Sequence, residues 1–371
     1  MENLAMNAMT NASANAAFWQ GKRVFITGHT GFKGSWLTLT LFRLGAKITG
    51  FALPPPTTPA LFDLARVGEG IHSVIADIRD ADAIHRAVRE ARPEILFHLA
   101  AQPLVRQSYA DPVETYTTNV MGLIHLLEAV RQSDSVRALV NITSDKCYEN
   151  REWLWGYREN ESLGGHDPYS SSKACAEIVT AAWRSSFFAP KTQTRTQTHI
   201  ATARAGNVIG GGDWGKDRLI PDILQAISAR QPLRLRNPRA IRPWQHVLEP
   251  LSGYLLLAEK LYAEGAAWAE AWNFGPADAD AQSVQQITKM LAQHWPDALH
   301  WEIETESQPH EAYALKLDAS KARARLGWRP RLDLRAALAE IARWQQAWQA
   351  GEDMRAVTLA QIAAFEQASP T

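Results

Sequence analysis

Tyr169 and Lys173 stand four positions apart in the segment Tyr-Ser-Ser-Ser-Lys. In a helix, this spacing places the phenol and the ammonium group on one face. A nearby ammonium and the positive charge of a bound cofactor would together lower the pKa of the phenol, so Tyr169 would become a usable proton acceptor near neutral pH. The same spacing also arises by chance on solvated helix faces. The spacing indicates a catalytic pair only if further reactive groups and a binding site accompany it.

A second group of reactive side chains follows the apolar run 137–143, where a threonine is succeeded by Ser144, Asp145 and Lys146. A hydroxyl here would complete a catalytic set with the tyrosine and lysine above, and Ser144 is preferred over the threonine before it. Asp145 and Lys146 offer one acid and one base to a second chemical step. On the surface, these two residues would form only a charged loop.

A glycine-rich turn supplies the binding site that such chemistry needs. Residues 28–34 (GHTGFKG) follow the apolar run 22–27 and open a helical pattern over 34–44. Glycines allow a tight turn and let the backbone reach a pyrophosphate at the helix N-terminus. The spacing is typical of short-chain dehydrogenases, and the alternative is an ordinary strand-to-helix turn. The residues expected to contact a dinucleotide here are Gly28, Thr30, Gly31, Phe32, Lys33 and Gly34.

The choice between NAD and NADP is less well determined by the residues. The acidic residue that would bind the ribose hydroxyls is missing where residues 51–53 lead into three prolines. Lys33 would favour a 2′-phosphate, or it would be an exposed lysine at a helix start. Asp77, with Ile78 beside it, would meet the adenine edge, or it would cap the next helix. NAD is the expected cofactor.

Elements that position these residues alternate regularly through the first half of the chain. Strands are expected over 22–27, 47–52, 73–76, 94–101, 137–143 and 199–204, and helices over 34–44, 81–90, 117–130 and 169–187. This alternation predicts an α/β fold with a Rossmann-type doubly wound parallel sheet, whose ligands lie beyond the carboxyl ends of the strands.

The domain organisation follows from where this alternation stops. A dinucleotide-binding domain is expected over 18–206, and a smaller, mainly substrate-binding C-terminal domain over 207–371. Their boundary is soft, because the chain can cross between the lobes more than once. Residues 1–17 are expected to form a flexible tail. The first of these residues do not resemble a signal peptide.

Composition excludes several other classes of function. The chain has 371 residues, 46% of them hydrophobic, and Lys+Arg and Asp+Glu both total 39. A formal net charge of zero gives no support for nucleic acid or an anionic membrane as the main partner. Two cysteines suggest no disulfide framework, and 11 scattered histidines suggest no metal site. No run is long and apolar enough to span a bilayer, so a cytoplasmic protein is expected.

Taken together, these residues resemble the nucleotide-sugar 4,6-dehydratases over nearly the whole chain, and most of all their CDP-glucose branch. The resemblance continues through segments 98–109, 204–214, 242–249 and 272–276, which read HLAAQPLVRQSY, RAGNVIGGGDW, RPWQHVLE and WNFGP. The related dTDP-glucose enzymes have Asp-Glu where this chain has Asp145-Lys146. The lysine, with the GGGDW and RPWQHV segments, therefore indicates a CDP-sugar substrate, CDP-glucose.

The resemblance implies an NAD-dependent lyase of deoxysugar and polysaccharide biosynthesis. Tyr169 takes the proton of the sugar 4-hydroxyl while hydride leaves C4. The 4-keto group acidifies the C5 hydrogen, which Lys146 removes, and Asp145 protonates the departing 6-hydroxyl. Hydride then returns to C6 and gives CDP-4-dehydro-6-deoxyglucose and water.

Further roles are implied by the same resemblance. Ala100 and Ala101 would line the cofactor, and Asn119 lies in the helix that supports it. The candidates for binding the nucleotide-sugar are Arg106, Asn207 and Arg242, and a guanidinium fork such as that of Arg242 matches diphosphate oxygens. Arg242 would otherwise form a salt bridge between the lobes.

The family also suggests a homodimer through helices 117–130 and 169–187, with a homotetramer as a further option. The rival functions are another nucleotide-sugar dehydratase or an epimerase on the same scaffold, and a non-catalytic dinucleotide sensor. An epimerase would not need an acid at Asp145 beside a base. A sensor would not need to retain both Tyr169 and Lys173.

Overall fold

The computed structural model describes residues 14–189, 197–295, 299–304 and 314–369. Its centre is a seven-stranded sheet in the order β11-β6-β5-β4-β1-β2-β3, and all its paired strands run parallel. The predicted Rossmann-type fold is therefore confirmed. The strands are β1 (Arg23–Thr27), β2 (Lys47–Ala52), β3 (His72–Ile75), β4 (Ile95–His98), β5 (Ala138–Ile142), β6 (His199–Ala205) and β11 (Ala271–Phe274).

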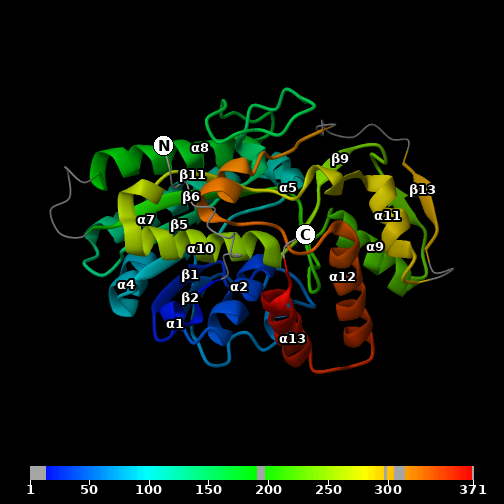
Figure 1. The fold of residues 1–371 in the computed structure, drawn as a ribbon, viewed down its shortest axis with the longest axis horizontal. Helices are drawn as coiled ribbons and strands as arrows, with labels where there is room; N and C mark the ends of the chain where they lie inside the picture. Colours follow the sequence, from blue (N-terminus) through cyan, green and yellow to red (C-terminus); the bar gives the residue numbers. More distant parts are fainter. Residues whose placement is uncertain (1–13, 190–196, 296–298, 305–313, 370–371) are drawn as a thin grey trace, which may run out of the picture.

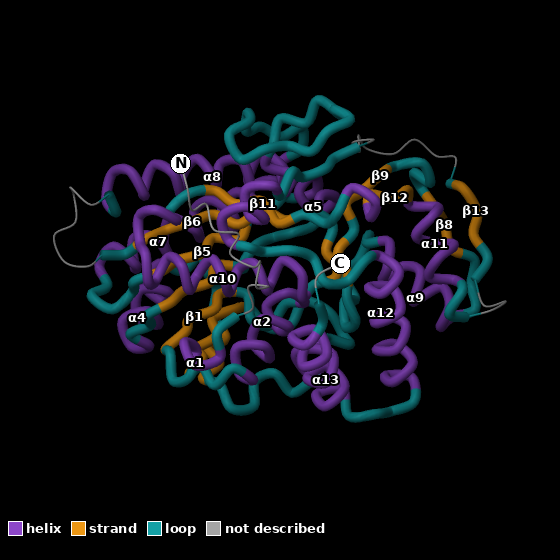
Figure 2. The backbone as a smooth tube through the Cα atoms, in the orientation of Figure 1, coloured by secondary structure: helices purple, strands orange, loops and turns teal. Residues whose placement is uncertain are grey.

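Helices cover both faces of this sheet, as the buried parallel strands require (Figures 1 and 2). Alternate residues of β1 enter different cores: Val24 and Ile26 face one side, and Phe25 faces the other. The first side packs mainly under α2 (Phe32–Arg43) and α10 (Leu248–Glu264). The second side packs under α4 (Ala81–Ala91), α7 (Gly122–Gln132) and α8 (Pro168–Phe187).

The second lobe lies beside the carboxyl ends of the strands and has its own apolar core (Figure 1). Its main helices are α9 (Leu219–Ala229), α11 (Val284–Ala292) and α12 (Leu334–Gln349). Three two-stranded sheets accompany them: β7 (Val208–Ile209) with β10 (Gln245–His246), β8 (Leu233–Leu235) with β13 (Trp301–Ile303), and β9 (Ile241–Pro243) with β12 (Ala281–Ser283). The last helix, α13 (Met354–Gln367), packs back against α2.

Short elements complete the chain and include the turns that carry reactive residues. They are α1 (Ala16–Trp19), α3 (Leu61–Leu64), α5 (Val105–Ala110), α6 (Pro112–Tyr116), a π-helical turn (Thr117–Met121), another (Ala322–Leu326), and 3₁₀ turns at Asp145–Cys147, Gly265–Trp268 and Asp278–Asp280. Within the described residues, no helix is both long and apolar enough to cross a membrane.

The structure differs from the predicted elements in three places. The fourth strand ends at His98, because residues 99–101 leave the sheet and line a cavity. The helix predicted over 117–130 begins as the π-helical turn and continues to Gln132 as α7. An edge strand, β11, joins the main sheet from far beyond residue 206 by pairing with β6. The chain thus crosses back between the two lobes.

Part of the expected N-terminal tail is ordered against the body, and residues 1–13 lie outside the described residues. The Asn15 side chain accepts hydrogen bonds from the backbone of α1, and the Asn15 N–H donates to Glu259 over 2.8 Å. Trp19 is buried, and its indole N–H donates to the same carboxylate over 2.6 Å. The end of this segment is therefore anchored to α10.

Candidate active site

One cavity of about 1290 Å³ opens at the carboxyl ends of the strands and extends under the second lobe. This is where ligands bind in a doubly wound sheet. The predicted site residues that line it are Gly28, Thr30, Gly31, Phe32, Lys33, Gly34, Asp77, Ile78, Ala100, Ala101, Arg106, Ser144, Asp145, Lys146, Tyr169, Lys173, Asn207 and Arg242. Side chains that are far apart in the sequence thus face a single space.

The glycine turn forms the floor of this cavity. Gly28 has a φ of +78°, and a Cβ on it would lie 2.8 Å from the backbone nitrogen of Ala100. A Cβ on Gly34 would lie 2.0 Å from the carbonyl oxygen of Gly28. Gly31 precedes α2 and supplies no side-chain cap, so the first N–H groups of α2 are left for another acceptor. This cradle fits a dinucleotide pyrophosphate.

The carboxylate that could meet an adenosine group follows β3, whereas it was expected after β2. Leu53, just beyond β2, is exposed, and its carbonyl oxygen accepts the Thr30 hydroxyl over 2.9 Å. Asp77 follows β3 and binds Arg79 at 2.6 Å, and this hydrogen bond holds the pKa of Asp77 below its usual range. Asp80 caps α4, so the interpretation of Asp77 as the cap is wrong. Asp77 remains the carboxylate available to an adenosine group here.

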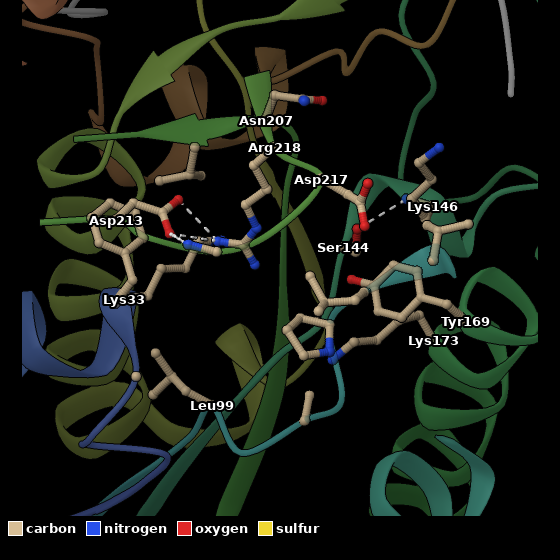
Figure 3. Close-up of a pocket in the computed structure, with 18 of the residues that line it drawn as sticks. Lys33, Leu99, Ser144, Lys146, Tyr169, Lys173, Asn207, Asp213, Asp217 and Arg218 are labelled. Carbon is tan, nitrogen blue, oxygen red and sulfur yellow. Dashed lines mark hydrogen bonds and ion pairs between the residues drawn. The ribbon is translucent and has the colours of Figure 1, made fainter. Parts of the chain in front are cut away.

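Lys33 points into the cavity, so its interpretation as an exposed lysine at a helix start is wrong. Burial, with Arg218 and Lys173 nearby, lowers the pKa of its ammonium group to about 8. Figure 3 shows Lys33 beside the ion pair of Asp213 and Arg218, across the cavity from Tyr169. The charged groups that act on Lys33 therefore lie in the centre of the cavity and do not include Asp77. The structure gives no support to Lys33 as a ligand of a cofactor 2′-phosphate.

The loop after β5 carries three of the predicted reactive groups. The Ser144 hydroxyl donates to Asp145 Oδ1 over 2.9 Å and accepts the Lys146 backbone N–H over 3.2 Å. Asp145 is 3% exposed, and its Oδ2 is a buried atom without a hydrogen-bond partner. Burial raises the pKa of Asp145 even though Lys146, Ser144 and Arg242 oppose the change. Asp145 is thus suited to hold a proton on the oxygen that is free.

The start of α8 supplies the tyrosine and lysine. The Asp167 side chain caps this helix by accepting the Ser170 N–H over 2.9 Å, and Tyr169 and Lys173 are both buried. Burial lowers the pKa of Lys173 to about 8, against the influence of Glu177. Figure 3 shows both side chains on the Ser144 side of the cavity.

The expected lowering of the Tyr169 pKa is not produced by the protein alone. Burial raises this pKa to about 12, although a hydrogen bond with Ser144 acts in the opposite direction. Desolvation disfavours a phenolate in a closed cavity, and the predicted lowering depends on a cofactor charge as well as on the helical lysine. A further positive charge in the cavity, beside the phenol, is therefore needed before Tyr169 accepts a proton near neutrality.

The residues expected to bind the nucleotide-sugar occupy the second-lobe side. Arg242 on β9 is buried and is among the charges that act on Asp145. Asn207 follows β6, and its carbonyl oxygen accepts the Gln245 N–H over 3.1 Å. Arg106 on α5 lies at the rim, with its guanidinium 3.7 Å from the Asp217 carboxylate. All three reach the cavity from different elements.

Asn119 is the one predicted site residue that does not line the cavity. Its amide oxygen accepts the Gln102 N–H over 2.8 Å, and its amide nitrogen donates to the Gln102 carbonyl and to Ser172 Oγ, over 3.1 and 2.9 Å. These bonds use the whole side chain. Asn119 therefore supports the loop after β4 and the start of α8 from behind, and direct contact with a cofactor is not supported.

An ion pair that the sequence did not reveal lies at the centre of the site. Arg218 binds Asp213 at 3.0 Å, and this carboxylate raises the pKa of the guanidinium (Figure 3). Asp213 belongs to the GGGDW segment, to which no residue role was given. A signal for Arg218 was present, because arginine stands at the N-cap of α9, where short polar residues are preferred.

Metal chemistry finds no support among the residues that the structure describes. In the part of the chain that the structure describes, no group of three His, Cys, Asp or Glu side chains is arranged to hold a metal ion. His246 is fully buried, and its ring packs against Trp36. The reactive groups of the cavity are therefore acids, bases and hydroxyls.

Comparison with known proteins places these features in one family. The model of the GDP-mannose 4,6-dehydratase family matches residues 25–341. The CDP-glucose 4,6-dehydratase of Salmonella typhimurium is 55% identical over 352 residues, which cover 95% of this chain and 98% of that protein. A dTDP-glucose 4,6-dehydratase of Xanthomonas campestris is 26% identical and covers 88% of this chain and 94% of its own.

Solved structures agree on the fold. DesIV, a dTDP-glucose 4,6-dehydratase from Streptomyces venezuelae solved with NAD and TYD bound, superposes with a TM-score of 0.73 at 21% identity, covering 90% of this chain and 99% of that one. At this identity the likeness concerns the fold alone. The family match and the relative at 55% identity confirm the resemblance read from the motifs. The chain is a member of the GDP-mannose 4,6-dehydratase family of nucleotide-sugar dehydratases.

Proposed function

We propose that this protein is an NAD-dependent CDP-glucose 4,6-dehydratase that forms CDP-4-dehydro-6-deoxyglucose and water. The observation that carries the proposal is Asp145, whose unpartnered, buried Oδ2 stands next to Lys146 in the cavity that also holds Tyr169 and Lys173. Oxidation alone needs only the last two residues. An acid and a base beside them are what an elimination requires. The Salmonella relative supports the choice of substrate.

The residues would share the work as follows. Tyr169 accepts the proton of the sugar 4-hydroxyl, and the Ser144 hydroxyl orients this group. The cradle of Gly28, Gly31 and Gly34 would hold NAD, which would accept hydride from C4 and return it to C6. The positive charge of its oxidised nicotinamide would favour ionisation of Tyr169.

The elimination falls to the loop after β5. Once C4 is a ketone, Lys146 removes the C5 hydrogen as a proton and leaves an enolate, whose electron pair forms the C5–C6 double bond when the 6-hydroxyl departs. The same lysine returns a proton to C5 when hydride reaches C6. Asp145 delivers its proton from Oδ2 to that hydroxyl, so water leaves instead of hydroxide. Burial favours the protonated carboxyl that this step consumes. On the substrate side, Arg242, Asn207 and Arg106 would hold the nucleotide diphosphate.

The test is incubation of purified protein and NAD with CDP-, dTDP-, GDP- and UDP-glucose, with products weighed by mass spectrometry. The proposal expects loss of one water from CDP-glucose and much slower loss from the other sugars. Isomerised CDP-sugar of unchanged mass would instead identify an epimerase. Dehydration of another nucleotide-sugar, with CDP-glucose left intact, would keep the reaction and overturn the base preference.

We also propose a homodimer, or a homotetramer of two such dimers, acting in the cytoplasm in deoxysugar synthesis for polysaccharide. Exposed apolar side chains lie on the helices predicted to pair: Met121 is 44% exposed, and Ile178 and Phe187 on α8 are 56% and 44% exposed. A contact between copies would cover such side chains. Light scattering on the native protein and on Ile178→Glu tests this. A variant that keeps the native mass would argue against the α8 interface.

A further inference from the structure

Both ends of the reactive loop after β5 are attached to the same buried ion pair. Glu177 on α8 and Arg204 on β6 lie 2.8 Å apart, and each side chain is 3% exposed. Thr143 immediately precedes the loop and Tyr148 immediately follows it, and each contacts one member of the pair. The proposed acid and base, Asp145 and Lys146, stand between these two attachment points.

The first attachment joins the start of the loop to the helix that carries the tyrosine. Glu177 lies four residues after Lys173 and eight after Tyr169, so all three share one face of α8. The Thr143 hydroxyl donates to Glu177 Oε1, and the Thr202 hydroxyl donates to Oε2 over 2.7 Å. The position of Thr143 is therefore set directly by the helix.

The second attachment joins the end of the loop to the arginine. Arg204 donates to the Tyr148 hydroxyl over 2.7 Å, and its guanidinium carbon lies 4.9 Å from the centre of the Tyr148 ring. The Tyr148 hydroxyl in turn donates to Asn273 Oδ1 on β11 over 2.8 Å. Tyr148 is 1% exposed, so water does not compete for these bonds. The end of the loop is thus fixed through the same ion pair.

We propose that Glu177 and Arg204, acting through Thr143 and Tyr148, are positioning residues that hold the elimination groups in register with the oxidation groups. This inference rests on the proposed dehydratase function. The two pairs of groups, Tyr169 with Lys173 and Asp145 with Lys146, must act in turn on adjacent carbons of one sugar. They come from different elements, and this network joins those elements.

The cost of the network supports a role beyond stability. Removing two charges from water costs several kcal/mol for each ion, and apolar residues of similar volume often serve stability as well or better. A misplacement of about 1 Å between reacting groups costs about a hundredfold in rate. A rigid link between α8 and the loop therefore has a chemical use.

The test compares three substitutions that each remove one buried hydroxyl. Thr143→Val and Tyr148→Phe each detach one end of the loop while the ion pair remains. Thr180→Val is the matched control, because its hydroxyl also joins α8 to β5, through Asn141 over 2.8 Å, but within the strand before the loop begins. Glu177→Gln is avoided as the main test, since it leaves Arg204 buried without its counter-ion.

Detaching the loop is expected to impair elimination more than oxidation. Thr143→Val and Tyr148→Phe should lower the rate of water loss about tenfold to a hundredfold, with KM for CDP-glucose changed less than about threefold. CDP-4-ketoglucose, which is two hydrogens lighter than CDP-glucose, should be released in part of the turnovers and should leave the cofactor reduced. Thr180→Val should keep the native rate and release only dehydrated product.

A second readout needs no cofactor or substrate. Hydrogen–deuterium exchange at the amides of residues 145–148 should be faster in Thr143→Val and Tyr148→Phe than in the native protein, and unchanged in Thr180→Val. Equal effects of all three variants on rate, product mixture and exchange would mean that the network serves only stability, and the proposal would fall. A native protein that dehydrates no sugar would overturn the proposed function itself, while the exchange result would still report on the link.

Discussion

Replacing Asp145 by asparagine separates the two halves of the proposed reaction. The substitution keeps the shape of the side chain, and an amide oxygen can still accept the hydrogen bond that Ser144 donates to Oδ1 over 2.9 Å. What disappears is the proton on the second oxygen, which has no other partner in the described structure. The oxidation residues Tyr169 and Lys173 are untouched. The loss should therefore fall on the departure of the 6-hydroxyl.

The magnitude follows from the role of a positioned acid. General acids contribute about 10²- to 10⁴-fold, so the barrier to water loss should rise by about 3 to 5 kcal/mol. Removal of the C5 hydrogen does not need this proton. In D₂O, the Asp145→Asn protein should thus return CDP-glucose that has gained one deuterium at C5, while almost no dehydrated sugar forms. Mass spectrometry of the recovered nucleotide-sugar measures both outcomes.

Stability should change in the direction opposite to activity. Burial raises the pKa of Asp145, so the carboxyl destabilises the native state once pH exceeds its ordinary value, and the penalty is complete above the raised value. Asparagine carries no such penalty. The variant should have a Tm at least as high as that of the native protein at neutral pH, and the difference should disappear in acid. Water loss within tenfold of native, or loss of deuterium uptake in parallel, would refute the assignment of Asp145 as the acid.

Four further substitutions test three other residues of the site and one buried carboxyl of α10 outside it. Tyr169→Phe should lower dehydration by about 10²- to 10⁴-fold and abolish deuterium uptake at C5, because the 4-hydroxyl is no longer deprotonated. Lys146→Ala should also abolish deuterium uptake, but CDP-glucose should still reduce the bound cofactor, which is measured by its near-ultraviolet absorbance. Gly34→Ala should weaken NAD binding at least tenfold by calorimetry and cost about 1 to 3 kcal/mol in denaturant unfolding, since its Cβ would lie 2.0 Å from a carbonyl oxygen. Glu249→Gln should stabilise the protein by up to about 3 kcal/mol at pH 8. Burial raises the pKa of Glu249 from 4.5 to about 7, so ionisation of this carboxyl opposes folding between those pH values. Equal stability of the variant and the native protein at pH 8 would contradict this.

Much of the candidate site could be predicted because parallel strands end at one edge of a sheet. The glycine turn after β1, Asp77 after β3, Ala100 after β4 and Ser144 after β5 are distant in sequence, yet a strand-by-strand interpretation brings them together. Local periodicity sufficed to place Tyr169 beside Lys173. Each of these inferences needs only the direction of neighbouring strands or one helical turn.

What escaped prediction depends on contacts between distant segments. Arg218 enters the cavity because the second lobe folds over the sheet, and its unusual place at the N-cap of α9 does not by itself show that it faces the site. The strand β11 is four residues long, and its pairing with β6 becomes visible only in three dimensions. The extent to which burial raises the Tyr169 pKa also escaped prediction, since the sequence shows a charged neighbour but not the desolvation of the phenol. The pKa of Lys33 likewise depends on Arg218 and Asp213, which the second lobe brings near it.

A single physical cause adjusts several of the reactive groups at once. Burial raises the pKa of Asp145 and lowers those of Lys33 and Lys173 to about 8, so these three groups are moved towards neutral pH. The same burial raises the pKa of Tyr169, which disfavours the phenolate, so this tyrosine requires a cationic partner in the cavity. Exclusion of water is therefore part of the catalytic apparatus. A substitution that opens the cavity without touching any reactive group should shift all of these groups together, whereas a change such as Asp145→Asn alters one.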